Sequence, residues 1–447
     1  MTPESLSRIE TDIQWLTQEI GPRPAFSSEA RLAALGIRDR LKEAGWSSEF
    51  VHTANNLVSC KGTGRVLLLA HSDTVPNSPG TLDNAVAVAT LLEVARLNPQ
   101  ADLCLGFPAQ EEIGLVGSTH LAEQIEAWHP DASKLELVVS LDLVGHGTLS
   151  VTGLNTDWNH SHLQALLNQT SVYSEYGYQV VSRLLPSMER SDHAPFANAG
   201  YLSMQLLGRD EHGVIPHYHQ STDTTYDVES IAVLMETLDS IIETHWTDQS
   251  PSLLPSATIG TTLLPWWMIG LLLLGVLFNT IRSIRTDGFP LLGPGIGIQI
   301  AMGAGGIASI PSVLHLFTPS EMEREVASLQ SFATSGWWDG ANLFLPLYIG
   351  TLWMLRSFLR CNGNATATAG LLGLGLSIVD PILALPWLFG SILSSIHPMM
   401  GLIGVAYWLQ PDILRQLSVH GLLPPTFWGV LGFLGMTAVL VNTQSKD

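Results

Sequence analysis

The segment RVLLLAHSDTVP, residues 65–76, begins as a continuous apolar run and then changes to polar and turn-forming residues. A short apolar run that is bounded by turn residues is typical of a buried β-strand. This run ends at His71, so the predicted strand places an imidazole at the edge of a sheet. Two more runs end at carboxylates: DLCLGFPAQEE (102–112) at Glu111 and Glu112, and LELVVSLD (135–142) at Asp142.

The first half of the chain alternates between helical and strand-like patterns. Helical periodicity covers residues 4–20, 27–44, 84–97, 114–128, 159–170 and 228–246, and strand-like runs cover residues 48–52, 56–60, 65–70, 102–107, 136–142 and 202–207. This alternation predicts a three-layer α/β fold with a mostly parallel sheet that is covered on both faces. Ligands bind beyond the carboxyl ends of the strands in such sheets, so the three strand ends predict one shared site.

Composition divides the 447 residues into two unlike parts, and a chain of this length is expected to form more than one domain. Residues 1–250 contain 12 of the 15 histidines. The formal net charge of −20 comes almost wholly from the same residues, which disfavours nucleic acid as a partner. We predict a globular domain over residues 1–250, a linker over 251–262, an all-α membrane domain over 263–441 and a tail over 442–447.

The membrane domain is predicted from hydropathy. Apolar runs of transmembrane length, about six in number, lie near residues 263–280, 289–317, 342–359, 366–388, 391–410 and 422–441. The lipid bilayer is therefore an expected partner. Asp380 and His397 lie inside these runs, each directly before a proline, and both a functional and a structural role suit an ionisable residue in that position.

Neither the chain start nor the cysteines indicate an export route. The start, MTPESLSRIETDIQWL, lacks the basic and apolar segments of a signal peptide. Cys60 and Cys104 lie in strand-like runs and Cys361 lies between two apolar runs. Their spacing shows no pairing, so no disulfide framework is expected.

Five side chains in the first half have the chemistry of zinc ligands: His71, Asp83, Glu112, Asp142 and His219. Zinc binds imidazole nitrogen and carboxylate oxygen, and a catalytic site leaves one position open for water. Two histidines and three carboxylates suit two Zn²⁺ ions, so one carboxylate has to bridge them. We assign the bridge to Asp83, because the turn TLDNA (81–85) presents it rigidly at the start of a predicted helix.

Two neighbouring carboxylates receive supporting roles. Asp73 follows His71 by two residues, and we expect it to accept a hydrogen bond from the far ring nitrogen and so fix the tautomer. Glu111 and Glu112 cannot both face the metal from a regular strand. Glu112 is therefore taken as the ligand and Glu111 as the general base.

The motifs HSD, LDN, QEEIGLVGS, SLDLVG, SDHAPF and HYHQSTDT together resemble those of peptidase family M28, the co-catalytic zinc aminopeptidases. The resemblance covers roughly residues 5–248. It implies that His71 and His219 each hold one ion, that either Glu112 or Asp142 accompanies each of them, and that Asp83 lies between the ions. It implies as well that Glu111 is the base.

The resemblance also assigns residues around the metal. It implies that Tyr218 hydrogen-bonds the tetrahedral oxyanion and that Asp192 and His193 line the substrate pocket. His217 is a rival of His219 as the ligand, and the motif favours His219 because it directly precedes the Gln-Ser-Thr-Asp-Thr run.

These expectations describe a membrane-anchored zinc exopeptidase, an aminopeptidase that hydrolyses N-terminal residues of peptides through a zinc-bridging water. One alternative is a glutaminyl cyclase, which keeps a single zinc and is disfavoured by the presence of both His71 and Asp142. Another is a non-catalytic receptor-like domain on a membrane anchor, which the retention of every ligand and of Glu111 disfavours. Neither the oligomeric state nor the preferred N-terminal residue follows from the sequence.

The side of the membrane that carries the peptidase domain is predicted from the basic residues. Arg282 and Arg285 directly follow the first apolar run. Basic residues next to the predicted spans form two groups, Arg282, Arg285, Arg356, Arg360 and Arg415 on one side of the membrane and Arg324 and Lys446 on the other. By the positive-inside tendency, the group that contains Arg282 and Arg285 is expected to be cytoplasmic. This places the peptidase domain outside the cytoplasm or in a lumen. The missing signal peptide argues in the opposite direction. The combination of a peptidase domain with several spans resembles endoplasmic-reticulum metallopeptidases and vacuolar membrane proteases.

Overall fold

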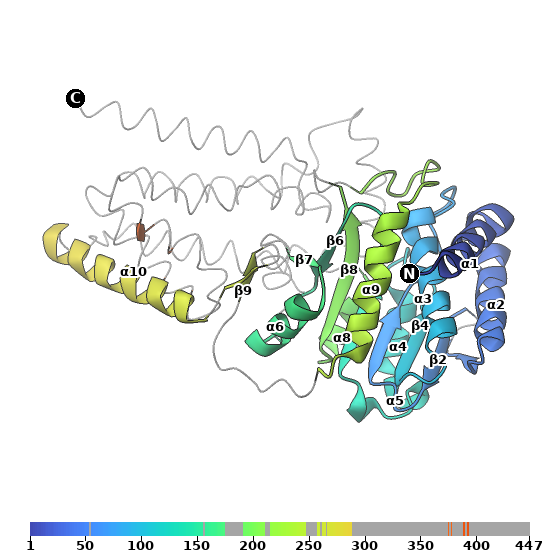
Figure 1. Ribbon diagram of the computed structural model, residues 1–447, viewed down its shortest axis with the longest axis horizontal. Helices are drawn as coiled ribbons and strands as arrows, with labels where there is room; N and C mark the ends of the chain where they lie inside the picture. The colour runs from blue at the N-terminus through green and yellow to red at the C-terminus, as the bar shows by residue number, and fades with distance from the viewer. Residues whose placement is uncertain are drawn as a thin grey trace. The chain divides into compact units, whose positions relative to one another are not determined.

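A computed structural model describes residues 1–52, 55–154, 157–174, 191–210, 215–246, 257–259, 262–264 and 266–287, together with five single residues between 374 and 392. The backbone divides into two compact units, residues 1–264 and 265–447 (Figure 1). The predicted zinc ligands all lie in the first unit, so its fold sets the geometry of the site.

Apart from α8 and η3, which were not predicted, the helices of the first unit agree with the predicted periodicities to within a few residues. They are α1 (Pro3–Gln14), α2 (Ser28–Glu43), α3 (Val86–Leu97), α4 (Val116–Glu123), α5 (Ile125–Trp128), α6 (His160–Gln169), α8 (His193–Asn198) and α9 (Val228–Glu243), with short helical turns η1 (Trp15–Ile20), η2 (Thr81–Ala85) and η3 (Ala132–Lys134). Side-chain caps fix several starts: Thr2, Ser27 and Asp227 each accept a hydrogen bond from a backbone amide of the first turn of α1, α2 and α9.

Eight strands form one sheet. They are β1 (Ser48–Phe50), β2 (Leu57–Lys61), β3 (Val66–Leu69), β4 (Leu103–Phe107), β5 (Leu137–Leu141), β6 (Thr148–Thr152), β7 (Tyr173–Ser174) and β8 (Ser203–Arg209). Their order across the sheet is β1-β2-β4-β3-β5-β8-β6-β7. The prediction omitted β6 and the two-residue β7, whose sequences carry no long apolar run.

The sheet is mixed, so the prediction of a mostly parallel sheet is correct only for its centre. The four central strands β4, β3, β5 and β8 are parallel to one another. Towards the edges, β2 pairs antiparallel with β4 and with β1, and β6 pairs antiparallel with β8. Because the centre is parallel, the carboxyl ends of β3, β4 and β5 meet at one edge, as the predicted site requires.

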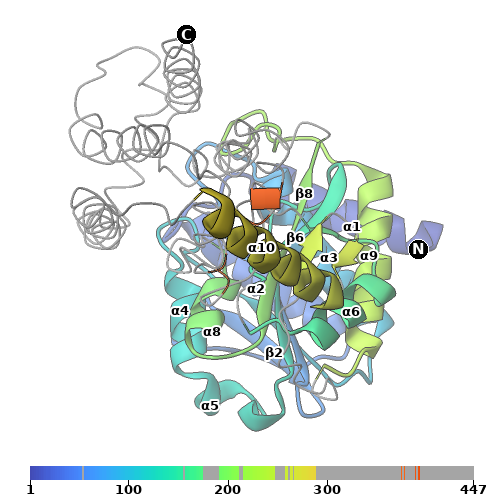
Figure 2. The same ribbon diagram turned by 90° about the vertical axis from the view of Figure 1, so that its left-hand side faces the viewer.

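Hydrophobic clusters cover both faces of the sheet, which confirms the three-layer arrangement. Val66 and Leu68 of β3 pack into the larger cluster with α1, α2, α3, α6 and α9. The alternate residues Leu67 and Leu69 pack into a second cluster with α4, α5 and α8. Figure 2 shows α4, α5 and α8 grouped on the other side of the strands from α3 and α9. The alternation follows from the two-residue period of a strand.

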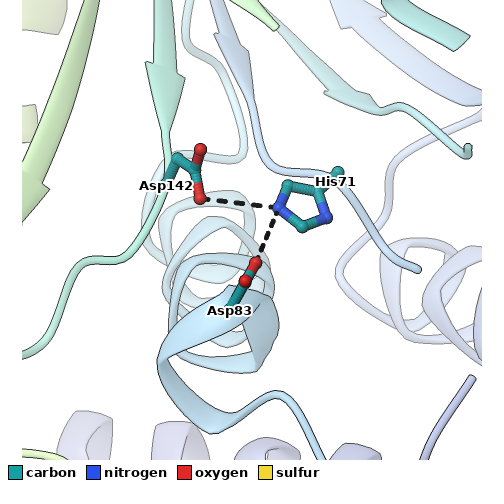
Figure 3. Close-up of side chains that lie close together, drawn as sticks. All are labelled: His71, Asp83 and Asp142. Carbon is teal, nitrogen blue, oxygen red and sulfur yellow. Dashed lines mark ion pairs between the residues drawn. The ribbon is translucent and has the colours of Figure 1, made fainter. Parts of the chain in front are cut away.

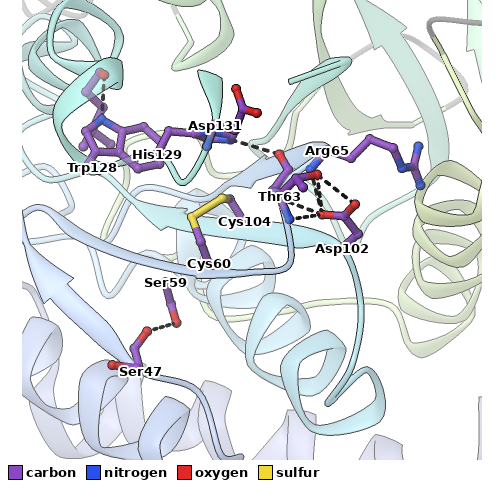
Figure 4. The surroundings of a disulfide bond; sticks show 12 residues. Ser47, Ser59, Cys60, Thr63, Arg65, Asp102, Cys104, Trp128, His129 and Asp131 are labelled. Atoms are coloured by element: carbon purple, nitrogen blue, oxygen red, sulfur yellow. Dashed lines mark hydrogen bonds between the residues drawn. A yellow bond between two sulfur atoms is a disulfide. The ribbon is translucent and has the colours of Figure 1, made fainter. Parts of the chain in front are cut away.

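A disulfide corrects the expectation that the cysteines are unpaired. Cys60 of β2 and Cys104 of β4 are directly opposite in the antiparallel register, and their sulfur atoms are bonded at 2.04 Å (Figure 4). The sequence separation of 44 conceals the pairing, because the pairing depends on β2 lying beside β4. Local spacing therefore could not reveal it.

The predicted membrane spans are only partly covered by the description. The first predicted span, 263–280, overlaps α10 (Trp266–Asp287). Within the described part of the chain, no helix combines the length and the apolar character needed to cross a membrane, so that prediction is not supported. The other five predicted spans, with Asp380 and His397, lie outside the described residues apart from single positions. Described residues of the predicted linker contribute to a two-stranded ribbon, β9 (Ala257–Ile259) with β10 (Thr262–Leu264).

Candidate metal centre

Strand ends deliver His71 and Asp142 to the same point. The chain leaves β3 at Leu69 and β5 at Leu141, and these two strands are parallel neighbours. His71 Nε2 lies 3.5 Å from Asp142 Oδ1 and 3.2 Å from Asp83 Oδ1, and both carboxylates point at the ring (Figure 3). All three residues are buried. They form the first of two groups whose ligand atoms are close enough to share one metal ion.

A second group lies beside the first and shares Asp83 with it. His219 Nε2 is 3.2 Å from Asp83 Oδ2 and 3.1 Å from Glu112 Oε2. The other Glu112 oxygen, Oε1, accepts a hydrogen bond from the Val75 amide at 3.0 Å, which orients the carboxylate. Asp83, Glu112 and His219 also meet the distance requirement for a common ion. The structure thus pairs His71 with Asp142 and His219 with Glu112, a choice that the sequence left open.

The backbone around Asp83 is held from three directions. Asp223 accepts hydrogen bonds from the amides of Leu82 and Asp83 at 3.0–3.3 Å. The Asn84 side chain donates to Leu141 O at 2.7 Å and so ties the turn to the end of β5. Gly80 has a φ of +62°, and a Cβ there would lie 2.3 Å from the carbonyl oxygen of Asp83. Only glycine fits that position without moving the turn.

Asp73 fixes the loop of the two glutamates rather than the histidine ring. His71 Nδ1 lies 3.2 Å from the Asp73 carbonyl oxygen, whereas the nearer carboxylate oxygen is 3.9 Å away. The Asp73 carboxylate instead accepts hydrogen bonds from the amides of Glu111 and Glu112 at 3.2 and 3.4 Å. The expected tautomer is still favoured, because Nδ1 donates to the carbonyl and leaves Nε2 as the ligand atom.

Burial dominates the electrostatics of the two glutamates. It raises the pKa of Glu111 well above its usual range, and the negative charges of Asp142, Glu112 and Asp192 raise it further. Burial and the charge of Asp83 raise the pKa of Glu112 to about 7. Carboxyl groups are packed here so closely that they disfavour one another's ionised form.

The pKa values of Asp83 and His219 shift in the direction that favours the charged form of each group, unlike those of the two glutamates. Burial alone would raise the pKa of Asp83, but the hydrogen bonds and positive charges of His219 and His71 lower it overall. Burial likewise opposes a charge on His219, yet its contacts with Asp83 and Glu112 raise its pKa to about 10. Positive charge is therefore strongly favoured between these carboxylates.

The donor set fits zinc. His71 Nε2 is buried and has no hydrogen-bond partner among the described residues, although two carboxylate oxygens lie within 3.5 Å of it. A nitrogen lone pair and carboxylate oxygens that converge in this way need a cation between them. Imidazole nitrogen with carboxylate oxygen is a donor set that zinc accepts, and each group of three leaves a position for water or substrate.

The other predicted site residues lie around the two groups. Tyr218 stacks on the His219 ring with centroids 3.8 Å apart and is 37% exposed. Asp192 and His193, at the start of α8, are buried, and the adjacent Ser191 hydroxyl lies 2.9 Å from that of Ser140 on β5. His217 is exposed and hydrogen-bonds Thr222, so it stands apart from both groups of ligand atoms.

Sequence reasoning missed the residues that hold the ligands in place. Arg23, Asn84 and Asp223 are buried polar side chains that contact backbone next to the ligands, not the ligands themselves. Asn84 follows a predicted ligand and Asp223 lies in the quoted Gln-Ser-Thr-Asp-Thr run, so both had a local signal. Arg23, in Gly-Pro-Arg-Pro, is far from the ligands in sequence and had none.

Comparison with known proteins finds a family model that is similar to part of this chain. Residues 55–241 match the family model described as peptidase family M28. Aminopeptidase YwaD of Bacillus subtilis is 31% identical over 167 residues, which cover 36% of each chain. A vacuolar membrane protease of Scheffersomyces stipitis is 30% identical over 135 residues, 28% of this chain and 14% of that protein. The matched regions thus span about a third or less of these relatives.

One solved structure is similar over more of the first unit. The zinc aminopeptidase BSAP from Bacillus subtilis covers 56% of this chain and 98% of its own, at 16% identity and a TM-score of 0.45. The matched residues 55–241 include all five predicted ligands and Glu111. Residues 55–241 are therefore similar to peptidase family M28, and both candidate ligand groups lie within the matched residues.

Proposed function

We propose that the chain is a zinc exopeptidase of the aminopeptidase type that holds two ions bridged by Asp83. One observation carries the proposal: the two oxygens of Asp83 face different histidines, Oδ1 towards His71 and Oδ2 towards His219, each at 3.2 Å. A carboxylate that serves a single ion has no need of two separate imidazoles on its two oxygens. His71 and Asp142 would hold one ion, and His219 and Glu112 the other.

The residues of this chain then have distinct tasks in peptide hydrolysis. Zinc, when bound, polarises a carbonyl oxygen and lowers the pKa of a bound water. Glu111 takes the proton of the attacking water on its carboxylate and returns it to the leaving amine. The hydrogen bonds from the Glu111 and Glu112 amides to Asp73 fix the loop that carries the base. Tyr218, whose ring stacks on that of His219, would donate a hydrogen bond from its hydroxyl group to the oxyanion.

Asp192 and His193 are proposed to line the pocket that receives the first residue of the substrate. Asp192 is fully buried, and burial raises its pKa to about 7, with the charges of Asp142 and Asp73 adding to the increase. An acidic wall of this kind favours a substrate that brings a positive charge, as the free amino terminus of a peptide does.

A digest of a peptide library by the purified full chain, read by mass spectrometry, tests the function. An aminopeptidase shortens peptides by one N-terminal residue at a time and leaves N-acetylated copies intact. A glutaminyl cyclase would instead remove ammonia from N-terminal glutamine without cleaving the chain. A receptor-like domain would change no peptide. The Glu111→Gln variant, prepared in parallel, excludes a contaminating protease.

Membrane attachment is proposed from the sequence and from the vacuolar membrane proteases among the relatives. If the group that contains Arg282 and Arg285 is cytoplasmic, the peptidase domain lies outside the cytoplasm or in a lumen. Cys361 follows Arg360 and provides the test. It should be shielded from a membrane-impermeant maleimide in intact cells while added protease digests the first 250 residues. Labelling of Cys361 with a protected peptidase domain would reverse the orientation.

A further inference from the structure

Arg23 is a fully buried cation in the segment between η1 and α2. Within the described residues it forms no ion pair. Its guanidinium donates instead to five backbone carbonyl oxygens at 2.8–3.3 Å, those of Leu16, Gly21, Ser72, Pro79 and Gly80. A buried guanidinium whose N–H groups are satisfied in this way fixes the carbonyls relative to one another, because the fork of donors is planar and rigid.

Three of these carbonyls belong to the two loops that carry metal ligands. Nε donates at 2.9 Å to Ser72 O, in the residue directly after His71. Nη1 donates to Pro79 O at 2.8 Å and Nη2 to Gly80 O at 3.3 Å, on the turn that leads to Asp83. The Arg23 side chain therefore joins the loop of His71, a proposed ligand of one ion, to the turn of Asp83, the proposed bridge.

The backbone of Arg23 adds to this connection. Its N–H donates to Thr74 Oγ1 at 3.0 Å, and its carbonyl accepts from the Thr74 N–H at 3.3 Å. Burial lowers the pKa of Arg23 to about 10, and the carboxylates of Asp73, Asp83, Asp223 and Glu112 act in the opposite direction. The side chain thus stays charged at neutral pH and offsets part of the negative charge that gathers at the ligands.

We propose that Arg23 is a positioning residue for the metal centre, which sets the separation of the His71 and Asp83 loops before zinc binds. The inference rests on the proposed two-ion site, because it concerns the distance between a ligand and the bridge. A preformed spacing lowers the cost of ordering the ligands when the metal binds. The predicted consequence is that Arg23 controls zinc affinity without touching zinc or substrate.

The test measures zinc affinity by competition with a chromophoric chelator, using the full-length chain. Arg23→Met keeps most of the volume but removes the charge and every donor, and we expect it to weaken zinc binding by about 10- to 100-fold. Arg23→Lys keeps the charge but cannot reach both loops with one ammonium, so its affinity should lie between those of the methionine variant and the native chain.

Arg65→Met is the matched control. Arg65 is also buried, and its guanidinium donates to the backbone carbonyls of Ile242 and Thr244. It directly precedes β3, whereas His71 follows the other end of that strand. Its loss should lower the melting temperature of the metal-free and zinc-loaded chains alike, with unchanged zinc affinity. For Arg23→Met, the rise in melting temperature on adding a fixed zinc concentration should be smaller than in the native chain.

The outcomes separate this inference from the proposed function. A native chain that binds no zinc would overturn both. A native chain that binds two ions, with Arg23→Met and Arg23→Lys binding them equally well, would overturn the positioning role alone. Should Arg23→Met fail to fold, Arg23→Lys decides: native affinity in that variant contradicts the need for a forked donor.

Discussion

At the scale of residues, the centre depends on one carboxylate that serves two imidazoles. Asp83 is buried, hydrogen bonds from its turn to Asp223 and Leu141 hold its backbone, and its two oxygens lie near different histidines. The sequence alone could predict which side chains converge, because strand ends and turns place these candidate ligands locally, and the structure brings them within reach of common ions. The supporting residues were not, since Arg23 reaches the ligand loops only through tertiary contacts.

Replacement of Asp83 by alanine should remove at least one zinc ion. Without the shared anion, the repulsion between two divalent cations is no longer offset and each ion loses a ligand. Metal analysis of the dialysed variant checks this. The paired variant Glu43→Ala, an exposed carboxylate at the end of α2, should keep the native zinc content. An Asp83→Ala protein with two ions and normal turnover would exclude a bridging role.

Glu111→Gln tests the base. Its amide cannot accept the proton of the attacking water, so kcat should fall by about 100- to 10,000-fold, while the zinc content stays at that of the native chain. Steady-state kinetics and metal analysis on the same preparation distinguish the roles. Loss of zinc together with activity would make Glu111 a ligand instead of a base.

At the scale of elements, alternation of periodicity predicted most helices and strands of the first unit, because each buries one apolar face. Periodicity did not predict the features that depend on pairing between segments far apart in the sequence. The antiparallel pairing of β2 and the Cys60–Cys104 disulfide both follow from the position of β2 beside β4. Neither feature has a local signature, so sequence spacing alone could not predict them.

The turn between β2 and β3 offers a test of stability. The Asp102 carboxylate accepts hydrogen bonds from the amides of Thr63 and Gly64 at 2.6 and 2.7 Å. Burial raises its pKa, but hydrogen bonds from the Thr63 hydroxyl and from the amides of residues 63–65 together lower it overall. A carboxyl group whose pKa is lower in the folded state than in the unfolded state stabilises the fold at pH values above the unfolded pKa. This stabilisation is lost as the pH falls through the folded pKa.

Asp102→Asn should therefore lower the free energy of unfolding by about 1 kcal/mol at pH 7. The difference from the native chain should shrink as the pH falls below about 4, where the carboxyl becomes protonated in the unfolded state, and vanish below the lowered folded pKa, where it is protonated in both states. Urea unfolding across this range measures it. The control Asp39→Asn, in an exposed pair with Arg38, should match the native chain. A constant difference between Asp102→Asn and the native chain at all pH values would disprove the charge argument.

At the scale of the whole molecule, the metal centre joins distant parts of the first unit. Its ligands come from the ends of β3, β4 and β5, from the turn before α3 and from the loop before α9. Removal of zinc by a chelator should lower the melting temperature of this unit and abolish peptidase activity, and added zinc should restore both. Activity that survives complete removal of the metal would contradict this coupling.

The number of zinc ions per chain tests the central claim most directly. Metal analysis of the native chain, purified with zinc and dialysed, should find two ions per polypeptide, because the structure provides two groups of ligands that share only Asp83. A single tightly bound ion in a fully folded, zinc-saturated chain would contradict the bridged centre.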